Sequence, residues 1–562
     1  VDSPDGQKRI EYKPTFGENL KFMFSYQVGV MYFRYFMWNF SGRQNDIQGS
    51  GGPFKGNWIT GFRFLDEPRL GPTEDIPGVL KDIPSRNVYF MLPLLLGLVG
   101  LYFQLNKDIR NFWVVSLLFI MTGLAIVVYL NQYPNQPRER DYAYAASFYA
   151  FAIWIGMGVL FIYEMLGRLT GKKLAVPLAI LAGLVVPFVM GTQNWDDHDR
   201  SGRYTAPAVA KNYLLSCAQN SILFTNGDND TFPLWYAQEV EEIGTDIRVC
   251  NLMLFNTDWF IDQMKQKMNE SDPMPLSLPR SKYYDGVNNQ VYIIERIKDP
   301  VDITQLIEFI KNDDPATKYR FGDGVERDYI PSRKVRIPVD KEKVLANGTV
   351  KVEDADKIVP YIDITLKGNY ILKSQLMVLD FLAHNKWERP VYYVAGYHED
   401  AFGLEEYFQL EGNAYRLVPI KSHNNNWLDY GRIDTEILYE NLMHRFEWGN
   451  ASDPDVVLDY YHKRTLSVIR ARLSYAKLAK ALVLEGDNKR AVEVLDYVMQ
   501  ELPLSQLPWD MFMPDVIEAY LEAGAKDKAK ELISQMREYY GEILSYYTGL
   551  RSDLMRAADY EI

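Results

Sequence analysis

The stretch Asn131-Gln-Tyr-Pro-Asn-Gln-Pro-Arg-Glu-Arg-Asp-Tyr142 places two arginines and two acids between two apolar runs of membrane-spanning length. Four such runs occur in this part of the chain, each close to the ~20 residues that a helix needs to cross a bilayer. They cover residues 88–105, 112–130, 143–166 and 174–190. We therefore expect four transmembrane helices, with a charged loop between the second and the third. Such a loop at a membrane surface is typical of a site that handles a charged ligand.

The charges of the short loops predict the orientation of these helices. Residues 106–111 and 167–173 are rich in lysine and arginine. Because cytoplasmic loops carry an excess of these residues, both loops are expected to face the cytoplasm. The loop that holds Arg138, together with everything after residue 190, is then expected outside.

Composition limits the classes of protein that remain. A net charge of −13 over 562 residues argues against a nucleic-acid partner. Cys217 and Cys250 are too few for a disulfide framework and are expected as buried thiols, although a single pair stays open. The mean hydropathy of −0.23 averages a greasy first third and a polar remainder.

Four segments are expected along the chain. Residues 1–87 predict an extracytoplasmic interfacial helix at 16–40 and a Gly-rich loop at 49–53, which is either a lid over a site or a plain linker. Residues 88–195 hold the four spans, residues 196–430 a periplasmic α/β domain, and residues 431–562 a helical region. The fold class is thus α-helical transmembrane, followed by α/β and by helical repeats.

Acidic residues gather directly after the last predicted span. Asp196, Asp197, His198 and Asp199 are hard oxygen and imidazole ligands that could hold a divalent cation. Consecutive residues cannot all point inward, so a solvated helix end is the plain alternative. No other cofactor is indicated by the sequence.

The region after residue 203 has the pattern of an α/β domain. Strands are expected at 221–225, 246–255 and 389–394, helices at 234–243 and 370–384, and β-like stretches at 334–339 and 349–352. Asp228, Asn229 and Asp230 lie in the turn after the first strand, where ligands bind in such sheets, so they are candidates for sugar hydroxyls or a cation. The same residue types also serve any tight turn or helix cap.

The last region contains an internal repeat. Gly486 and Gly524 are separated by 38 positions, as are Ala491 and Ala529. Paired helices with small residues at close contacts resemble tetratricopeptide-type repeats. Such a region would cap the α/β domain or offer a groove to a protein partner.

Several motifs together resemble a known family. They are Tyr35-Phe-Met-Trp-Asn-Phe40, Gly42-Arg-Gln-Asn-Asp46, Gln136-Pro-Arg-Glu-Arg-Asp-Tyr142, Asn194-Trp-Asp-Asp-His-Asp-Arg200 and Asn226-Gly-Asp-Asn-Asp-Thr231, with Tyr26-Gln27 before them. Their order is similar to that in a Bacteroidota membrane family of formerly unknown function, related to protein O-mannosyltransferases. The resemblance covers essentially the whole chain.

The resemblance implies a C-type glycosyltransferase in the bacterial inner membrane. Such an enzyme takes a sugar from a polyprenyl-phosphate carrier at the periplasmic face and transfers it to an acceptor, here expected to be protein hydroxyl groups. Arg138, Arg140, Asp141 and Tyr142 are the expected donor-phosphate site, because guanidinium groups at an interface can hold a lipid phosphate bidentately. Arg43, Asn45 and Asp46 are further candidates for binding acceptor or sugar.

No catalytic base is assigned. Enzymes of this type usually carry the catalytic acid in an early extracytoplasmic loop, and Val1 is not an initiator, so the chain is expected to be the C-terminal part of a longer protein. Two other classes stay open: a non-catalytic envelope scaffold or partner-binding membrane subunit, and part of a transporter. The transporter class is weakened because the predicted spans lack interior charges.

Overall fold

The computed structural model describes residues 13–74, 76–134, 136, 138–322, 324–394, 401–422 and 430–558. The chain groups into two compact units. The first unit comprises residues 1–201 and 534–562, and the second unit comprises residues 202–533. This grouping is coarser than the four segments expected from the sequence, and their boundaries stay a prediction.

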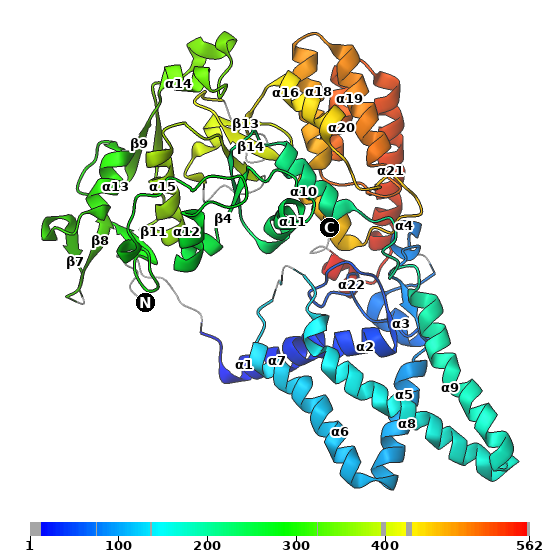
Figure 1. Cartoon of the computed structure of the whole chain (residues 1–562). Helices are drawn as coiled ribbons and strands as arrows, with labels where there is room; N and C mark the ends of the chain where they lie inside the picture. Colours follow the sequence, from blue (N-terminus) through cyan, green and yellow to red (C-terminus); the bar gives the residue numbers. More distant parts are fainter. Residues whose placement is uncertain are drawn as a thin grey trace. The chain divides into compact units, whose positions relative to one another are not determined.

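The first unit begins with one continuous helical run, as the sequence predicts. It consists of α1 (Phe16–Phe22), the π-helix η1 (Met23–Phe33) and α2 (Arg34–Phe40) (Figure 1). A capping box between Thr15 and Glu18 starts it. The aromatic residues of α2 are buried in a core shared with the apolar helices, so this half of the run is not only an interfacial element.

A loop region follows α2 and returns to it through a small sheet. The strand β1 (Gly42–Arg43) pairs antiparallel with β2 (Asn87–Val88), and two short helices, α3 (Arg63–Leu70) and α4 (Gly78–Lys81), lie between them in sequence. Gly42 is required here, because a Cβ would lie 2.5 Å from the carbonyl oxygen of Asn87. The pairing places the Gly42–Asp46 motif beside the residues that precede the N-terminus of the first apolar helix, α5 (Leu92–Lys107).

Three apolar helices in the described part of the chain are long enough to cross a membrane, at Ile109–Leu130, Asp141–Thr170 and Lys172–Asn194. They correspond to three of the four predicted spans. Their elements are α6 (Ile109–Thr122), α7 (Leu124–Leu130), η2 (Asp141–Tyr144), α8 (Ala145–Thr170) and α9 (Lys172–Asn194).

The remaining predicted span is shorter than the sequence suggests. Its helix, α5 (Leu92–Lys107), has 16 residues and therefore extends about 24 Å, less than the ~30 Å of a hydrocarbon core. Phe90 and Met91 adopt φ angles of 52° and 56°, which are not compatible with a right-handed helix, so the helix cannot begin at Val88. The bounds of this helix are therefore corrected from 88–105 to Leu92–Lys107, and a fourth membrane span here stays a prediction.

Close contact between α5 and α8 depends on glycine. A Cβ on Gly100 would lie 1.7 Å from the carbonyl oxygen of Trp154, so the two backbones touch there. Further along, Lys107 Nζ lies 2.8 Å from Glu164 Oε2. The two helices therefore run in the same direction, which places the loops after α5 and α8 at the same end, as predicted from their charges.

The last residues of the chain belong to the first unit. From residue 534 on they include the end of α21 (Lys526–Thr548) and α22 (Ser552–Ala558). The ring of Tyr547 packs edge-on against Phe54 at 5.0 Å, and Arg551 Nη2 donates a hydrogen bond to the carbonyl oxygen of Pro68 at 2.9 Å. The sequence did not indicate this return of the chain to the region of residues 54–71.

The second unit contains a six-stranded mixed sheet with the order β15-β13-β14-β12-β3-β4. Its strands β12, β3 and β4 are parallel to one another, which confirms the predicted α/β character. The strands are β3 (Ile222–Thr225), β4 (Arg248–Asn251), β12 (Val391–Val394), β13 (Phe408–Leu410), β14 (Ala414–Leu417) and β15 (Arg432–Ile433). The accompanying helices are α10 (Thr205–Leu215), α11 (Asp228–Glu239), α12 (Asp258–Met264) and α15 (Lys373–Asn385).

Two smaller sheets complete the α/β part (Figure 1). The first has the order β10-β9-β6 and the second the order β11-β5-β8-β7. Their strands are β5 (Gln290–Ile293), β6 (Val301–Asp302), β7 (Lys318–Arg320), β8 (Glu326–Ile330), β9 (Lys334–Pro338), β10 (Tyr361–Thr365) and β11 (Tyr370–Leu372), with the helices α13 (Ile303–Lys311) and α14 (Lys341–Ala346).

One β-like prediction is confirmed in these sheets and another is wrong. The stretch at 334–339 is β9, whereas 349–352 is not a strand. Val350 N instead donates to the carbonyl oxygen of Val344, which closes the end of α14 after a turn at Gly348 with φ 70°. The chain then enters the 3₁₀ helix η6 (Val352–Lys357).

The C-terminal part of the second unit is helical, as predicted. Gly486 (φ 86°) and Gly524 (φ 83°) end corresponding helices, which explains their repeat in the sequence. Likeness to tetratricopeptide repeats stays a prediction. The helices are α16 (Thr435–Glu440), the π-helix η9 (Asn441–Arg445), α17 (Tyr460–Val468), α18 (Ala471–Leu484), α19 (Asn488–Glu501) and α20 (Met513–Glu522).

Candidate functional site: an arginine loop closed from behind

Glu139, between the two arginines of the charged loop, forms a buried ion pair with Arg34 of α2. Arg34 Nη2 donates to Glu139 Oε2 at 2.8 Å and Arg34 Nη1 donates to Glu139 Oε1 at 3.1 Å. The side chains are only 4% and 6% exposed. This is the bidentate geometry in which a guanidinium binds a carboxylate most strongly. The sequence places the two partners 105 positions apart.

Further donors saturate the Glu139 carboxylate. Tyr35 Oη donates to Oε2 at 2.5 Å, and the backbone N–H of Gly49 donates to Oε1 at 2.9 Å. Arg34 Nη1 also donates to the carbonyl oxygen of Gly56 at 2.6 Å. The Gly-rich segment is thereby tied to the arginine loop at Gly49, and Gly56 beyond it is tied to Arg34. The sequence leaves open whether this segment acts as a lid or as a linker.

Aromatic rings and electrostatics reinforce the charged state of Arg34. Its guanidinium carbon lies 4.6 Å from the ring centre of Tyr35 and 4.8 Å from that of Trp38. Burial acts to lower the pKa of Arg34, but the hydrogen bonds and charge of Glu139 outweigh it and raise the pKa above its usual value. The guanidinium of Arg34 therefore stays charged within this pair.

The two arginines on either side of Glu139 both contact Tyr142, and Arg140 is half-buried. Arg138 is exposed, and its guanidinium carbon lies 5.6 Å from the ring centre of Tyr142. Arg140 Nη1 donates to Tyr142 Oη at 2.8 Å, and Arg140 Nε donates to Gln136 Oε1 at 3.3 Å. In the described part of the chain, neither arginine forms an ion pair with a carboxylate.

The backbone of the loop is held by the same network. The N–H of Arg140 donates to Tyr35 Oη at 3.1 Å, and Tyr35 in turn donates to Glu139. Asp141, which the sequence also places at this site, is half-buried and begins η2. Asn135 and Pro137 of the quoted stretch lie outside the described residues.

This arrangement can bind an oxyanion. Two guanidinium groups, which have no carboxylate partner within the described ranges, lie at the end of a helix that is long enough to span a membrane. Each offers planar donors that match the oxygens of a phosphate. Because the charge of Glu139 is compensated by Arg34, it does not cancel the positive charges of Arg138 and Arg140.

Arg43 and Asn45, which the sequence predicts to bind sugar or acceptor, have different surroundings in the structure. Arg43 lies on β1, and its guanidinium stacks on Trp38 at 4.2 Å. Asn45 is buried and uses both ends of its amide, Nδ2 to the carbonyl oxygen of Phe54 at 2.9 Å and Oδ1 from the N–H of Gly56 at 2.7 Å. These contacts make Asn45 a brace of the loop.

Asp46 is partly engaged as well. Its Oδ1 accepts a hydrogen bond from Ser85 Oγ at 2.9 Å, and its backbone N–H donates to the same hydroxyl at 3.1 Å. A role for Arg43, Asn45 or Asp46 in binding sugar or acceptor stays a prediction. Of the three, Arg43 keeps the most unused donors.

The acidic cluster after α9 is not gathered into a ligand set. Among the described residues, no group of three or more His, Cys, Asp or Glu side chains is placed to hold a metal ion. Asp197 accepts from Asn87 Nδ2 at 3.0 Å and contacts His198 Nδ1 at 2.8 Å, whereas Asp199 Oδ1 accepts from the N–H of Ser201. Asp196 Oδ1 accepts from the N–H of Asp197. The cation site over these four residues stays a prediction.

Asp228, Asn229 and Asp230 form the first turn of α11 rather than a free turn. Asp230 accepts from the N–H groups of Asn226 and Gly227, both at 2.9 Å, and so caps the helix. Burial raises the pKa of Asp230 against these hydrogen bonds. Asp228 and Asn229 are exposed at the same end of the sheet.

Sequence reasoning missed Arg34, Tyr35 and Glu139 as members of the site. One signal was present: a single arginine within a run of aromatic residues needs a partner when that run is buried. Cys217 and Cys250 are buried free thiols, as expected.

Comparison with known proteins gives one match. Residues 206–437, which cover the α/β part of the second unit, match the family model described as TMEM260-associated domain 2. No curated protein and no solved structure matches the chain. The family match relates this region to TMEM260-type glycosyltransferase-like proteins.

Proposed function

We propose that the chain takes part in transferring a sugar from a polyprenyl-phosphate carrier to protein hydroxyl groups at the periplasmic face of the bacterial inner membrane. Arg138 and Arg140 hold the carrier phosphate in this proposal, with Tyr142 between them. The match of residues 206–437 to a domain of glycosyltransferase-like proteins supports the class of reaction. Three helices that are long and apolar enough to span a membrane support a lipid-linked donor.

One observation carries the proposal. Glu139 is hydrogen-bonded to Arg34, Tyr35 and Gly49. Among the described residues, Arg138 and Arg140 therefore contact a single tyrosine, Tyr142, and no carboxylate. A phosphate that bridges them would receive charge-assisted hydrogen bonds, each of which contributes about 1.5–3 kcal/mol. These bonds strengthen as the phosphate becomes the leaving group and gains charge.

The test is a set of arginine-to-lysine exchanges. Arg138→Lys and Arg140→Lys keep the charge but lose the planar fork, so transfer should fall roughly tenfold or more in each, the equivalent of one charged hydrogen bond. Transfer is measured in membranes at equal protein level. Arg168→Lys, in the last turn of α8, is the matched control and should transfer like the natural protein. Unchanged transfer in both loop variants would refute the phosphate role.

The orientation of the helices in the membrane is tested by labelling introduced cysteines. The two native cysteines should not react with the label, because both are buried. Tyr133→Cys and Lys173→Cys each add one reactive thiol at opposite ends of the helices. A maleimide that cannot cross the membrane, added to spheroplasts, should label Tyr133→Cys and not Lys173→Cys. The reverse pattern would place the arginine loop in the cytoplasm and exclude a periplasmic reaction.

A further inference from the structure

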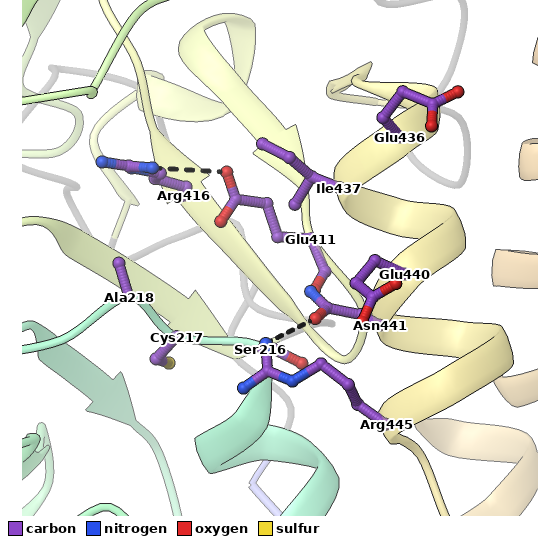
Figure 2. Close-up of a pocket in the computed structure, with 10 residues that line it drawn as sticks. All are labelled: Ser216, Cys217, Ala218, Glu411, Arg416, Glu436, Ile437, Glu440, Asn441 and Arg445. Carbon is purple, nitrogen blue, oxygen red and sulfur yellow. Dashed lines mark hydrogen bonds and ion pairs between the residues drawn. The ribbon is translucent and has the colours of Figure 1, made fainter.

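The second unit contains a cavity of about 410 Å³ that no part of the proposed transfer site uses. Three segments line it: the residues after α10, the hairpin of β13 and β14, and the junction of α16 with the π-helix η9 (Figure 2). Its volume lies within the range of pockets that bind small molecules. The site is also close to the end of the family match at residue 437.

A buried arginine beside the cavity has one donor, Nε, without an acceptor among the described residues. Arg416, on β14, is 6% exposed, and its Nε has no hydrogen-bond partner among the described residues. Its Nη1 lies 3.6 Å from Glu411 Oε1, which is an ion pair but not a hydrogen bond, and its Nη2 is 3.5 Å from Thr349 Oγ1. Buried donors are normally satisfied, so acceptors from outside the chain are expected here.

The carboxylate next to Arg416 is fixed in place. Glu411 Oε2 accepts from Tyr392 Oη and Oε1 accepts from Gln409 Nε2, both at 2.6 Å. Burial raises the pKa of Tyr392 well above its usual value, and the charge of Glu411 adds to this, so the phenol remains a donor. Each carboxylate oxygen can accept a second hydrogen bond. The cavity wall thus presents a fixed donor and a fixed acceptor side by side.

The opposite wall is built from η9. Asn441 Nδ2 donates to the carbonyl oxygen of Glu411 at 2.7 Å, and Arg445 Nη1 donates to Asn441 Oδ1 at 2.8 Å. Figure 2 shows Arg416 and Arg445 on different sides of Glu411. Short π-helical turns within helices are rare and occur often at functional sites.

The charges around the cavity decide the class of ligand. Three carboxylates line it, those of Glu411, Glu436 and Glu440, against the two guanidinium groups of Arg416 and Arg445. Glu436 is paired with Arg490 at 2.8 Å. An anionic ligand would add charge to a wall that is already balanced or acidic. A neutral molecule with several hydroxyl groups can accept from Arg416 and donate to Glu411 without that cost.

We infer that this cavity binds a neutral carbohydrate. Arg416 donates to its oxygens, Glu411 accepts from an adjacent hydroxyl, and Arg445 contacts it at the mouth. The inference concerns a second site and does not rest on the proposed transfer reaction. In a sugar-transferring protein such a site would retain an acceptor or product that already carries sugar.

Binding is measured on the full chain in nanodiscs by saturation-transfer NMR. The probes are the methyl glycosides of mannose, glucose and N-acetylglucosamine, with inorganic phosphate and acetate as competitors. At least one glycoside should bind, and neither anion should displace it. Absence of binding by all three glycosides, or displacement by phosphate, would overturn the inference.

Variants separate this cavity from any sugar site near the membrane. Arg416→Lys should weaken binding roughly tenfold, because it removes two of the guanidinium donors while keeping the charge. Ala218→Met places a larger side chain in the lining of the cavity and keeps the backbone N–H that donates to Tyr392 Oη. It should abolish binding, so it decides the matter if Arg416→Lys fails to fold. Glu447→Gln, an exposed residue outside the cavity, is the control.

The double variant Arg138→Lys/Arg140→Lys should bind the glycoside like the natural protein. Retained binding in Ala218→Met, or its loss in the double loop variant, would assign the sugar to another site and overturn the inference. A variant that loses transfer but still binds glycoside argues for the separate phosphate site, and one that loses glycoside binding but still transfers argues for the cavity. The two proposals can therefore fail independently of each other.

Discussion

Two buried arginine–glutamate pairs in this protein have the same chemistry and opposite construction. Arg34 and Glu139 in the first unit meet at 2.8 and 3.1 Å, and further donors occupy the carboxylate. Arg416 and Glu411 in the second unit stay 3.6 Å apart, and Arg416 keeps an unpaired Nε next to a cavity. In the first pair, the carboxylate and the guanidinium hydrogen-bond directly to each other. In the second pair, a guanidinium N–H remains available to a ligand in the cavity.

The energetics of buried charge explain why this difference matters. Taking two charges out of water costs several kcal/mol per ion, and the attraction between them offsets this only with good geometry and additional hydrogen bonds. The Arg34–Glu139 pair meets both conditions and fixes the loop that carries Arg138 and Arg140. The Arg416–Glu411 pair has additional hydrogen bonds on the carboxylate but lacks the close geometry between the two charges. A ligand or water in the cavity would supply the missing acceptor for Arg416 Nε.

Breaking the closed pair should have the largest effect on stability. Glu139→Gln leaves Arg34 buried without a counter-charge, which should cost about 3–5 kcal/mol. Glu411→Gln should cost less, because water in the cavity can reach Arg416. Thermal unfolding of both variants in nanodiscs checks the order. Equal losses would show that the two pairs are not built differently.

Replacing both partners of the closed pair tests whether it also positions the loop. Arg34→Met/Glu139→Leu should be more stable than Glu139→Gln alone, because no unpaired charge remains. Transfer should nevertheless stay low, since Tyr35 loses the acceptor that orients it toward the N–H of Arg140. Recovery of full transfer together with stability would assign the pair a purely structural role.

Neither pair could be found from the sequence, for a physical reason. Local patterns revealed the apolar helices, the buried strands and the aromatic run at 16–40, because hydrophobic periodicity reports each element by itself. Glu139 has arginines on both sides in sequence, yet it turns away from them toward a residue 105 positions earlier. Arg416 belongs to a short buried strand, and nothing in its neighbours indicates a cavity.

Element ends were predicted less well than the elements themselves. The helix expected at 370–384 begins at Lys373, because Tyr370–Leu372 pairs with β5 as strand β11. The helix expected at 234–243 already begins at Asp228, because Asp230 caps it. Pairing with a distant strand and capping geometry decide such boundaries, and hydrophobic spacing contains little information on either.

A milder change at the open face of the arginine loop should affect donor binding without affecting stability. Tyr142→Phe removes the hydroxyl that accepts from Arg140 Nη1 and keeps the ring beside Arg138. The loss of one exposed hydrogen bond, about 1 kcal/mol, should raise the KM for the lipid-linked donor roughly fivefold. An unchanged KM, or a fall in melting temperature like that of Glu139→Gln, would contradict the division into an open and a closed side.

A third buried carboxylate, Asp380, should give the smallest effect, because neutral donors already saturate it. It accepts from Ser277 N and Oγ, both at 2.8 Å, and from Leu278 N at 3.0 Å. The half-buried His384 also contacts it, with 3.0 Å from Nδ1 to Oδ1. The hydrogen bond to Asp380 raises the pKa of His384 above its usual value, against the opposing effect of burial.

Since the pKa is raised in the folded state, the histidine stabilises the fold below the unfolded pKa of about 6.5, and this contribution is lost as pH rises through the folded pKa. His384→Gln should therefore lower the melting temperature at about pH 5.5 by an amount that corresponds to at most about 1 kcal/mol, and hardly at about pH 8.5. If the difference in melting temperature between His384→Gln and the natural protein instead grew toward alkaline pH, Asp380 would not be raising the pKa of His384. The neutral donors of Ser277 and Leu278 would then be the groups that stabilise the Asp380 carboxylate.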